Sequence, residues 1–248
     1  MRGIRKTGRR AQRFLLSLLL TLGCSSFSAA AQPPSFQDLV DAAEPNATLA
    51  PPPGTYAGPV IVDKPLTIDG RDQVTIDAGG TGTVVVLDTD GATLKNLHLT
   101  NSGSSHNDID AGVQLRGNFN VVKNNRIDDC LFGVDIQQSD NNLVKQNRIS
   151  SKDVELGLRG DAIRLWYSFN NKITDNVIRN SRDTVVWYSR DNLIARNDAR
   201  GGRYSLARKY SSALSDRREE ERPLRRSFVN AQATFLLCRS PRNFAKAA

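Results

Sequence analysis

The segments NVVKNN (residues 120–125), NLVKQN (142–147), NKITDN (171–176) and NLIARN (192–197) decide the fold of this chain. Each begins and ends with asparagine, and successive starting positions differ by 22, 29 and 21. One basic period of 21 or 22, with a single insertion before Asn171, therefore runs from Gly112 to Tyr204. A repeat of this length is typical of a solenoid whose units stack on one another.

Short alternations of aliphatic and other residues predict strands upstream of these segments. The aliphatic pairs are Val60/Val62, Leu66/Ile68, Val74/Ile76, Val84/Val86 and Leu97/Leu99. Turn residues separate them, and no helical period appears between them. The connections are too short to hold crossover helices, so aliphatic residues that recur once per unit should stack in line. The sequence thus predicts an all-β fold, a parallel β-helix of about six coils.

The asparagine spacing also aligns the strands of the later coils. It predicts that the pairs Val134/Ile136, Ile163/Leu165 and Thr184/Val186 face the interior. The intervening residues then face outward, because successive side chains of a strand point to opposite sides. These outward residues are Asp135, Gln137, Arg164, Trp166, Val185 and Trp187.

The repeated asparagines have a structural interpretation. Strands stacked about 4.8 Å apart bring identical side-chain amides within hydrogen-bonding reach of the next coil. Such ladders would satisfy polar groups that the corners of a solenoid bury. We expect this role, and no catalytic one, for Asn120, Asn125, Asn142, Asn147, Asn171, Asn176, Asn192 and Asn197.

A short helix is expected before the first strand. Ser35 is a suitable N-cap, and Phe36, Leu39, Val40 and Ala43 follow at the spacing of one helical face. This apolar stripe could cap the open N-terminal end of the solenoid.

The charge of the chain is unevenly placed. The formal net charge is +8, but residues 1–31 carry six basic and no acidic residues, and residues 205–248 carry ten basic and four acidic ones. Residues 32–204 hold 18 basic and 22 acidic residues, a balance of −4. The high pI therefore says little about the folded body and does not predict a nucleic-acid-binding protein.

Residues 1–31 are typical of an export signal. A basic stretch precedes an apolar run at residues 14–22, which is too short to span a bilayer, and Ala29-Ala30-Ala31 offers a cleavage site. The expected location is the periplasm. Two alternatives remain open: a lipoprotein signal ending at Cys24, and a twin-arginine signal at Arg9-Arg10. We expect residues 32–206 to form the β-helix domain with its cap, and residues 207–248 to be a basic, non-repeat tail that is disordered or aberrant.

The most promising binding residues come from a second repeat. Trp166-Tyr167-Ser168 and Trp187-Tyr188-Ser189 lie one coil apart, so the two tryptophans should lie over each other on one outer face. Exposed aromatic residues that gather in this way favour a contact surface for a sugar or a protein. The alternative is that the insertion at residues 152–160 folds over the rings and makes them a small core.

Four segments resemble one protein family: residues 54–60 (GTYAGPV), 65–70 (PLTIDG), 160–168 (GDAIRLWYS) and 201–206 (GGRYSL). They resemble the NosD family, maturation proteins of the copper enzyme nitrous-oxide reductase. The resemblance spans about residues 35–206 and implies a right-handed β-helix in the periplasm. It also implies work with an ABC-type membrane complex that delivers copper or sulfur to the reductase. Family members are longer, so we expect a shortened copy of the family pattern.

The residues themselves support copper binding poorly. Copper sites need Cys, Met or His, and the exported chain would keep only His98, His106, Cys130 and Cys238. Neither histidine has a partner at ligand spacing. No cofactor is therefore expected from the sequence, copper enters through the resemblance alone, and docking or scaffolding is the expected role.

An enzyme of another class remains the alternative. A polysaccharide lyase or glycosidase needs paired carboxylates, or acidic residues that hold calcium beside an arginine base. The candidates lie on neighbouring coils near the aromatic pair: Asp161, Asp183, Arg164 and Arg182, with Asp135 and Asp140 one coil away. No dense acidic cluster is visible, so we assign no catalytic residue. The residues expected to contribute to binding are Trp166, Tyr167, Trp187, Tyr188, Arg164, Asp161 and Asp183.

Overall fold

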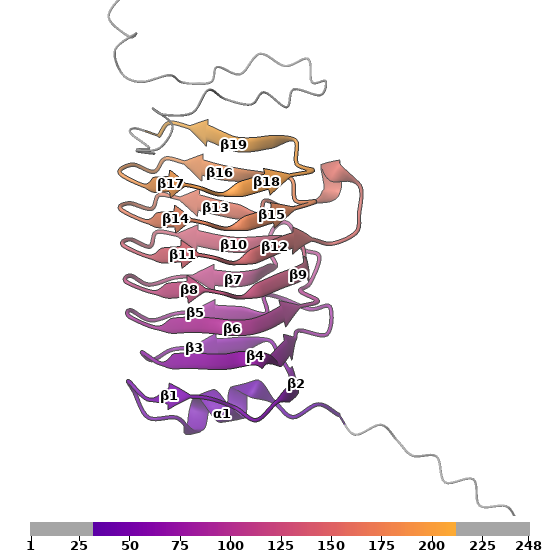
Figure 1. Cartoon of the computed structure of the whole chain (residues 1–248), viewed down its shortest axis with the longest axis vertical. Coiled ribbons are helices and arrows are strands. Elements are labelled where there is room, and N and C mark those ends of the chain that lie inside the picture. Colours follow the sequence, from indigo (N-terminus) through magenta and orange to yellow (C-terminus); the bar gives the residue numbers. More distant parts are fainter. Residues whose placement is uncertain (1–31, 212–248) are drawn as a thin grey trace, which may run out of the picture. The chain divides into compact units, whose positions relative to one another are not determined.

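The computed structural model describes residues 32–211. These residues belong, except for Gln32, to the second of two compact units, Pro33–Ala248. The expected export signal and most of the expected tail lie outside the described residues. Within residues 32–211 one strand follows another and each coil stacks on the coil before it (Figure 1). The expected all-β parallel β-helix is confirmed.

One sheet, which we call sheet B, takes a single strand from each coil. It has seven strands, all parallel to their neighbours, where about six coils were expected. In spatial order they are β3 (Val60–Val62), β5 (Val85–Leu87), β7 (Ala111–Leu115), β10 (Phe132–Gln137), β13 (Ile163–Trp166), β16 (Asp183–Trp187) and β19 (Tyr204–Lys209).

The remaining strands form sheet A, which turns a corner. Strands β4 (Thr67–Asp77) and β6 (Thr93–Thr100) are long enough to run through this corner. In each later coil the corresponding segment is divided into two short strands, and those of the next coil pair with β6 on either side of the corner. On one side lie β1 (Thr48–Leu49), β8 (Val121–Lys123), β11 (Leu143–Lys145), β14 (Lys172–Thr174) and β17 (Leu193–Ala195). On the other lie β2 (Gly54–Ala57), β9 (Arg126–Cys130), β12 (Arg148–Ser151), β15 (Val177–Arg179) and β18 (Asp198–Arg200).

Aliphatic columns fill the interior. The register joins Val134 to Ile163 and Thr184, and Ile136 to Leu165 and Val186, as the repeat predicts. All of these side chains are buried. The predicted alternation of Val84 and Val86 is shifted by one residue in the structure, because β3 pairs Val60 with Val85 and Val62 with Leu87. Val86 therefore lies in the outer row of β5, and Val85 and Leu87 face the core.

Asparagine ladders run through two corners, as expected, but they bind chiefly to the main chain. The Oδ1 atoms of Asn142, Asn171 and Asn192 each accept a bond from the backbone N–H of the ladder asparagine one coil earlier, over 2.8 Å. The second ladder repeats this geometry at 3.0 Å through Asn147, Asn176 and Asn197. Both ladders reach one coil further, where Asn120 and Asn125 accept from the N–H groups of Ala92 and Leu97. Each Oδ1 thus ties one coil to the preceding one.

The expected cap is helix α1 (Phe36–Ala42), and Ser35 is its N-cap, with its side chain accepting from the N–H of Asp38. Phe36 and Val40 are fully buried, and Leu39 and Ala43 pack against the same core cluster. Gln37 exchanges two hydrogen bonds with the backbone of Ile61 in β3. The helix therefore covers the first coil by apolar contact and fixes its orientation by polar contact.

Two further features depart from the simple repeat. The insertion before residue 171 contains the 3-10 helix η1 (Leu156–Leu158), between β12 and β13. At the other end, β19 continues to Lys209 and pairs Val185 with Ala207 and Trp187 with Lys209. The last described coil thus extends past residue 206, where the sequence repeat was expected to stop.

Candidate functional site

The outer side of sheet B carries the residues singled out from the sequence. Its register places Gln114, Asp135, Arg164 and Val185 in one row. The next row holds Arg116, Gln137, Trp166, Trp187 and Lys209. We call the cluster of Trp166, Tyr167, Trp187, Tyr188 and Tyr210 the aromatic face.

The rings of the aromatic face contact one another across three coils. Trp166 and Trp187 have ring centroids 5.4 Å apart at 62°. The tyrosine rings stack almost parallel, with centroids of Tyr167 and Tyr188 4.8 Å apart and those of Tyr188 and Tyr210 5.1 Å apart. The two tryptophans are therefore neighbours across one coil, as expected, but they meet edge-on, and the rings that stack are those of the tyrosines. Tyr167 and Tyr210 remain 44% and 74% exposed, so the ladder presents an accessible apolar surface.

Local backbone geometry explains how the tyrosines come to lie outside. Tyr167, Tyr188 and Tyr210 have φ of 47°, 50° and 48°, the left-handed region, at the corner that follows each sheet B strand. Bulky side chains rarely adopt this region, which asparagine or glycine occupies at lower cost. Gln138 has the same conformation, with φ of 49°, at this corner of the preceding coil, so the left-handed turn is a feature of the coil that tyrosines occupy on the three coils after it.

The third residue of the Trp-Tyr-Ser repeat has a structural role. The Oγ atoms of Ser168 and Ser189 accept from the backbone N–H of Ser139 and Ser168, at 3.3 Å and 3.0 Å. Ser168 and Ser211 also donate to the carbonyls of Ile136 and Val186. These serines form a third ladder, which the sequence analysis missed, although Lys209-Tyr210-Ser211 follows Trp187-Tyr188-Ser189 by about one period.

The insertion does not cover the aromatic face. It precedes Ile163, the first residue of β13, whereas Trp166 ends that strand. Figure 1 shows η1 projecting from the stack on the side where β13 begins. Its own contacts are with the β9–β10 region, through Gly160 to Leu131 and Lys152 to Asp129. The tyrosine ladder instead borders an open groove of about 610 Å³, which Phe169, Ser189, Arg190 and Ser211 also line.

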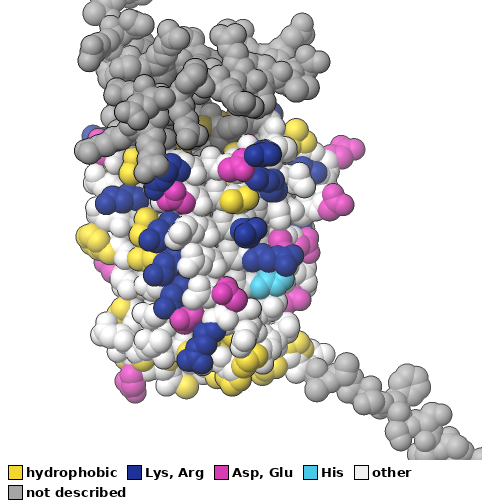
Figure 2. Space-filling model, in the orientation of Figure 1, with side chains coloured by type: hydrophobic (Ala, Val, Ile, Leu, Met, Phe, Trp, Pro, Cys, Tyr) yellow, Lys and Arg dark blue, Asp and Glu magenta, His cyan; other side chains and the backbone are white. Residues whose placement is uncertain are grey.

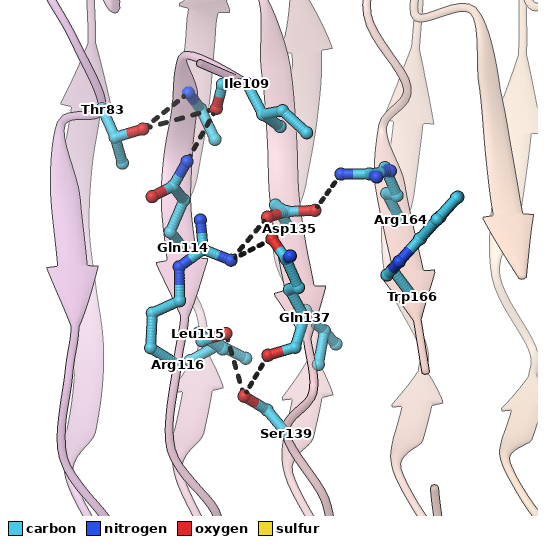
Figure 3. A network of polar contacts seen from close by, with 12 residues as sticks. Thr83, Ile109, Gln114, Leu115, Arg116, Asp135, Gln137, Ser139, Arg164 and Trp166 are labelled. Carbon is cyan, nitrogen blue, oxygen red and sulfur yellow. Dashed lines mark hydrogen bonds and ion pairs between the residues drawn. The ribbon is translucent and has the colours of Figure 1, made fainter. Parts of the chain in front are cut away.

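A charged network lies next to Trp166. Asp135 has a fully buried side chain and accepts from Arg116 at 3.3 Å and from Arg164 at 3.0 Å (Figure 3). Burial raises the pKa of the Asp135 carboxyl, and the two guanidinium groups oppose that shift. The Arg164 guanidinium also lies over the Trp166 ring, 4.9 Å from its centroid. Arg164 thus joins the buried carboxylate to the aromatic face.

Two other acidic candidates, Asp161 and Asp183, are already paired with arginines. Asp161 accepts from Arg182 at 3.0 Å, and Asp183 accepts from Arg203 at 2.8 Å and from the N–H of Tyr204. Both residues are 3% exposed. Burial raises the pKa of Asp183, which the hydrogen bond from Arg203 opposes. Since each carboxylate has an arginine partner from the next coil, these pairs join coils, and the structure brings no two of the acids together at a free site.

The soft-metal candidates lie apart. His98 binds Asp128 through Nε2 at 2.7 Å, and His106 lies edge-on to Phe132. Cys130 is buried in the core, and burial raises the pKa of its thiol to about 12. Among residues 32–211 no group of three or more His, Cys, Asp or Glu is positioned to hold a metal ion. The described residues therefore do not fit a copper-holding site.

Comparison with known proteins gives one family and one relative. The family model described as "Right handed beta helix region" matches residues 71–213. The "Probable ABC transporter binding protein NosD" of Pseudomonas aeruginosa is 28% identical over 133 residues, which are 52% of this chain and 31% of that protein. The chain thus matches less than a third of the length of this relative. No solved structure matches the chain significantly.

No helix among residues 32–211 is long and apolar enough to cross a membrane. The family model covers more than half of the chain, and its extent includes the stacked parallel coils from the middle of β4 to β19. The chain belongs to the right-handed β-helix family.

Proposed function

We propose that this chain is a NosD-like docking protein, exported to the periplasm, that assists an ABC-type membrane complex in the maturation of nitrous-oxide reductase. The observation that carries the proposal is the aromatic face. Its partner, by this proposal, is a protein surface of the complex or of the reductase.

Three properties of the aromatic face support docking. Its rings are aromatic and partly exposed, the composition that dominates the energetics of protein interfaces. They lie on a rigid stack of strands, so little conformational entropy is lost when a partner binds. The guanidinium of Arg164, held by Asp135, adds a fixed positive charge beside Trp166.

The likeness to NosD supports the choice of partner. The printed name of that relative associates it with an ABC transporter. The matched segment is less than a third of that protein, so the partner is carried here as a proposal.

Copper and sulfur delivery enters this proposal as the task of the whole assembly. Copper would be cargo, and the described residues of this chain do not offer it a site. The proposed contribution of the chain is therefore to hold partners together.

The test is a co-purification of the full chain with an ABC-type complex and a nitrous-oxide reductase of the same organism, expressed together. Trp166→Ala and Tyr188→Ala should each weaken capture at least about 30-fold, the effect of removing a central interface residue. Phe119→Ala is the matched control, because Phe119 is 62% exposed but lies outside the aromatic face. Equal capture by the wild type and both aromatic-face variants would contradict the proposal.

Polysaccharide binding or cleavage is the second candidate, since stacked exposed rings also suit sugars. Cleavage has less support, because Asp135, Asp161 and Asp183 are engaged by arginines. Release of new reducing ends from pectin or alginate by the purified chain would favour an enzyme, and its absence would favour docking.

A further inference from the structure

The groove beside the tyrosine ladder has two walls and a floor. Tyr167, Tyr188 and Tyr210 line it from one side. Two positions further along the chain than the first two tyrosines, Phe169 and Arg190 line it from the other side. The Arg190 guanidinium lies over the Phe169 ring, 5.0 Å from its centroid. Because both walls take one residue from each successive coil, the groove runs along the axis of the solenoid.

The floor of the groove has little hydrogen-bonding capacity left. Ser189 lines it but is only 1% exposed, and its hydroxyl donates to the carbonyl of Trp187 and accepts from the N–H of Ser168. The hydroxyl of Ser211 donates to the carbonyl of Val186. A ligand whose backbone N–H groups need acceptors would therefore find few of them at this floor.

The tyrosine wall presents ring edges and hydroxyl groups. Successive rings lie within 6° and 16° of parallel, so they cover one another's faces. The edge of an aromatic ring carries the positive part of its quadrupole. Within residues 32–211 the hydroxyl groups of Tyr167, Tyr188 and Tyr210 have no hydrogen-bond partner. This wall is therefore electropositive and offers three hydroxyl donors.

Arg190 adds a full positive charge to the opposite wall. Its side chain is 66% exposed, and its ion pair with Asp191 is long, at 3.8 Å. An exposed ion pair of this kind contributes little. The guanidinium thus remains available to a carboxylate of a ligand, and both walls favour a ligand rich in hydrogen-bond acceptors.

We propose that this groove binds a proline-rich, acidic segment in the polyproline II conformation. The segment belongs to the partner that docks on the aromatic face, so the inference rests on the proposed docking function. Proline has no N–H group, so a proline-rich backbone offers mainly carbonyl acceptors. These acceptors suit the tyrosine hydroxyls, and the lack of N–H groups suits the floor. Aromatic-lined grooves are a known mode of polyproline II recognition.

The dimensions of the ladder agree with this ligand. A polyproline II helix repeats every three residues, a rise of about 9.3 Å. The centroid spacings of 4.8 Å and 5.1 Å put the first and third tyrosine rings no more than about 10 Å apart. One turn of the ligand therefore spans the three coils, and prolines three residues apart meet the first and third rings.

A sugar chain fits this wall less well. A sugar ring stacks on the face of an aromatic ring, whereas the stacked tyrosines turn their edges to the groove. The Phe169 ring likewise has Arg190 over one of its faces. The groove thus favours a ligand that accepts hydrogen bonds at ring edges over one that stacks on ring faces.

The test is a fluorescence titration of the full chain with a capped nonapeptide of three Pro-Pro-Glu repeats. Trp166 and Trp187 are the two tryptophans of the chain, and the Trp166 ring lies 5.6 Å from Tyr167 and 5.4 Å from Tyr188. Binding beside the ladder should therefore change the tryptophan emission. Three Ala-Ala-Glu repeats should bind at least about tenfold more weakly, because they lack the preformed conformation. Three Pro-Pro-Lys repeats should also bind more weakly, because their charge opposes that of Arg190.

Conservative variants locate the site. Tyr188→Phe keeps the ring stack and removes the central hydroxyl, so it should weaken binding about three- to tenfold without lowering the melting temperature. Phe169→Ala and Arg190→Gln should each weaken binding about fivefold or more. Arg148→Gln is the matched control for charge and should leave the affinity unchanged. Arg148 is exposed on β12 of sheet A, the face on which Figure 2 shows Lys and Arg side chains in rows.

The inference is overturned by no binding, by equal binding of either control peptide, or by unchanged affinity in Tyr188→Phe and Arg190→Gln. A change of emission with hexagalacturonate but not with the Pro-Pro-Glu peptide would also overturn it. Co-purification with Trp166→Ala and Tyr188→Ala separates this inference from the docking proposal. Capture that depends on both residues, without peptide binding, leaves docking intact and overturns the inference. Peptide binding with capture that ignores both residues overturns docking and supports the ligand class of the groove.

Discussion

The side-chain oxygen of Asn147 accepts a hydrogen bond from the backbone N–H of Asn125 over 3.0 Å, although the two residues belong to different coils. The amide nitrogen of Asn147 donates to the carbonyl of Val122 and to Oδ1 of Asn176. One buried side chain therefore joins three coils. The equivalent residue of the other ladder, Asn142, accepts from Asn120 N–H but has no partner for its Nδ2 atom.

This difference predicts unequal effects of two matched substitutions. Asn147→Ala should lower the free energy of unfolding by about 2–4 kcal/mol, because it leaves a buried N–H and a buried carbonyl unsatisfied. Asn142→Ala should cost less, about 1–2 kcal/mol, since it also removes a donor that already lacks a partner. Denaturant unfolding followed by circular dichroism measures both. An Asn142→Ala variant less stable than Asn147→Ala would contradict this interpretation of the ladders.

The Trp-Tyr-Ser repeat should separate into structural and binding parts. Ser168→Ala removes a buried hydroxyl of the serine ladder and should destabilise the fold by about 1–2 kcal/mol while leaving partner capture intact once folded. Tyr167→Ala removes a ring that is 44% exposed and should weaken capture with a smaller change in stability. Thermal unfolding and co-purification, made on the same preparations, check the pair. Loss of capture in folded Ser168→Ala would contradict the division.

Asp128 should contribute to stability in a defined range of pH. Burial alone would raise its pKa, but the hydrogen bond from His98, helped by Arg126, lowers the pKa to about 2. An unfolded aspartate titrates near about 3.9, so the folded state favours the ionised form. The stabilisation is present above about pH 4 and is lost as the pH falls toward about 2.

Asp128→Asn should therefore reduce stability at pH 6 by about 1–2 kcal/mol and much less near pH 2.5. Melting temperatures of both proteins across this range provide the measurement. Asp153→Asn, at an exposed position in the insertion, is the control and should show no such pH-dependent difference. Curves for wild type and Asp128→Asn that stay parallel from pH 6 to pH 2.5 would contradict the assignment.

Cys130 should be chemically inert in the folded protein. It is buried, and its thiol pKa of about 12 leaves almost no thiolate at neutral pH. Iodoacetamide should label residue 130 only after unfolding, which peptide mass spectrometry of native and unfolded samples can show. Rapid labelling of Cys130 under native conditions would show that this part of the core opens readily.

The architecture followed from the sequence because a solenoid is a local repeat. Each coil contacts mainly its two neighbours, so a nearly constant period and an aliphatic alternation specify the stacking of Val134, Ile163 and Thr184. The cap was equally readable, since Ser35 and the stripe from Phe36 to Ala43 are a local signal. The prediction failed where consecutive aliphatic residues leave the phase open. Val84, Val85 and Val86 carry no alternation, and the neighbouring strands decided which of them face inward.

The site was harder to read because its contacts cross coils at unequal sequence distances. Arg116 reaches Asp135 from the coil before it and Arg164 from the coil after it, and the insertion makes the second sequence separation longer than the first. Tyr210 follows a lysine where its two counterparts follow tryptophan, so the period alone was a weak signal, and the pairing of β16 with β19 placed Tyr210 in line with Tyr188. The cations of sheet A, such as Lys123 and Lys145, could not be singled out from composition. Residues 32–204 hold 18 basic and 22 acidic residues, and this count does not say which of them form ion pairs.

The sequence by itself determined that residues 112–204 coil, with which period, and which aliphatic residues could fill the interior, because these depend on patterns within one or two turns of chain. Only the tertiary structure decided which charges neutralise one another and which do not. Ion pairs such as Arg182 with Asp161 form between coils. Whether a cation has such a partner depends on the register between neighbouring strands, which the sequence alone does not give. For that reason the paired arginines of sheet B, such as Arg164, and the cations of sheet A that have no ion-pair partner among residues 32–211, such as Lys123, could be told apart only in three dimensions.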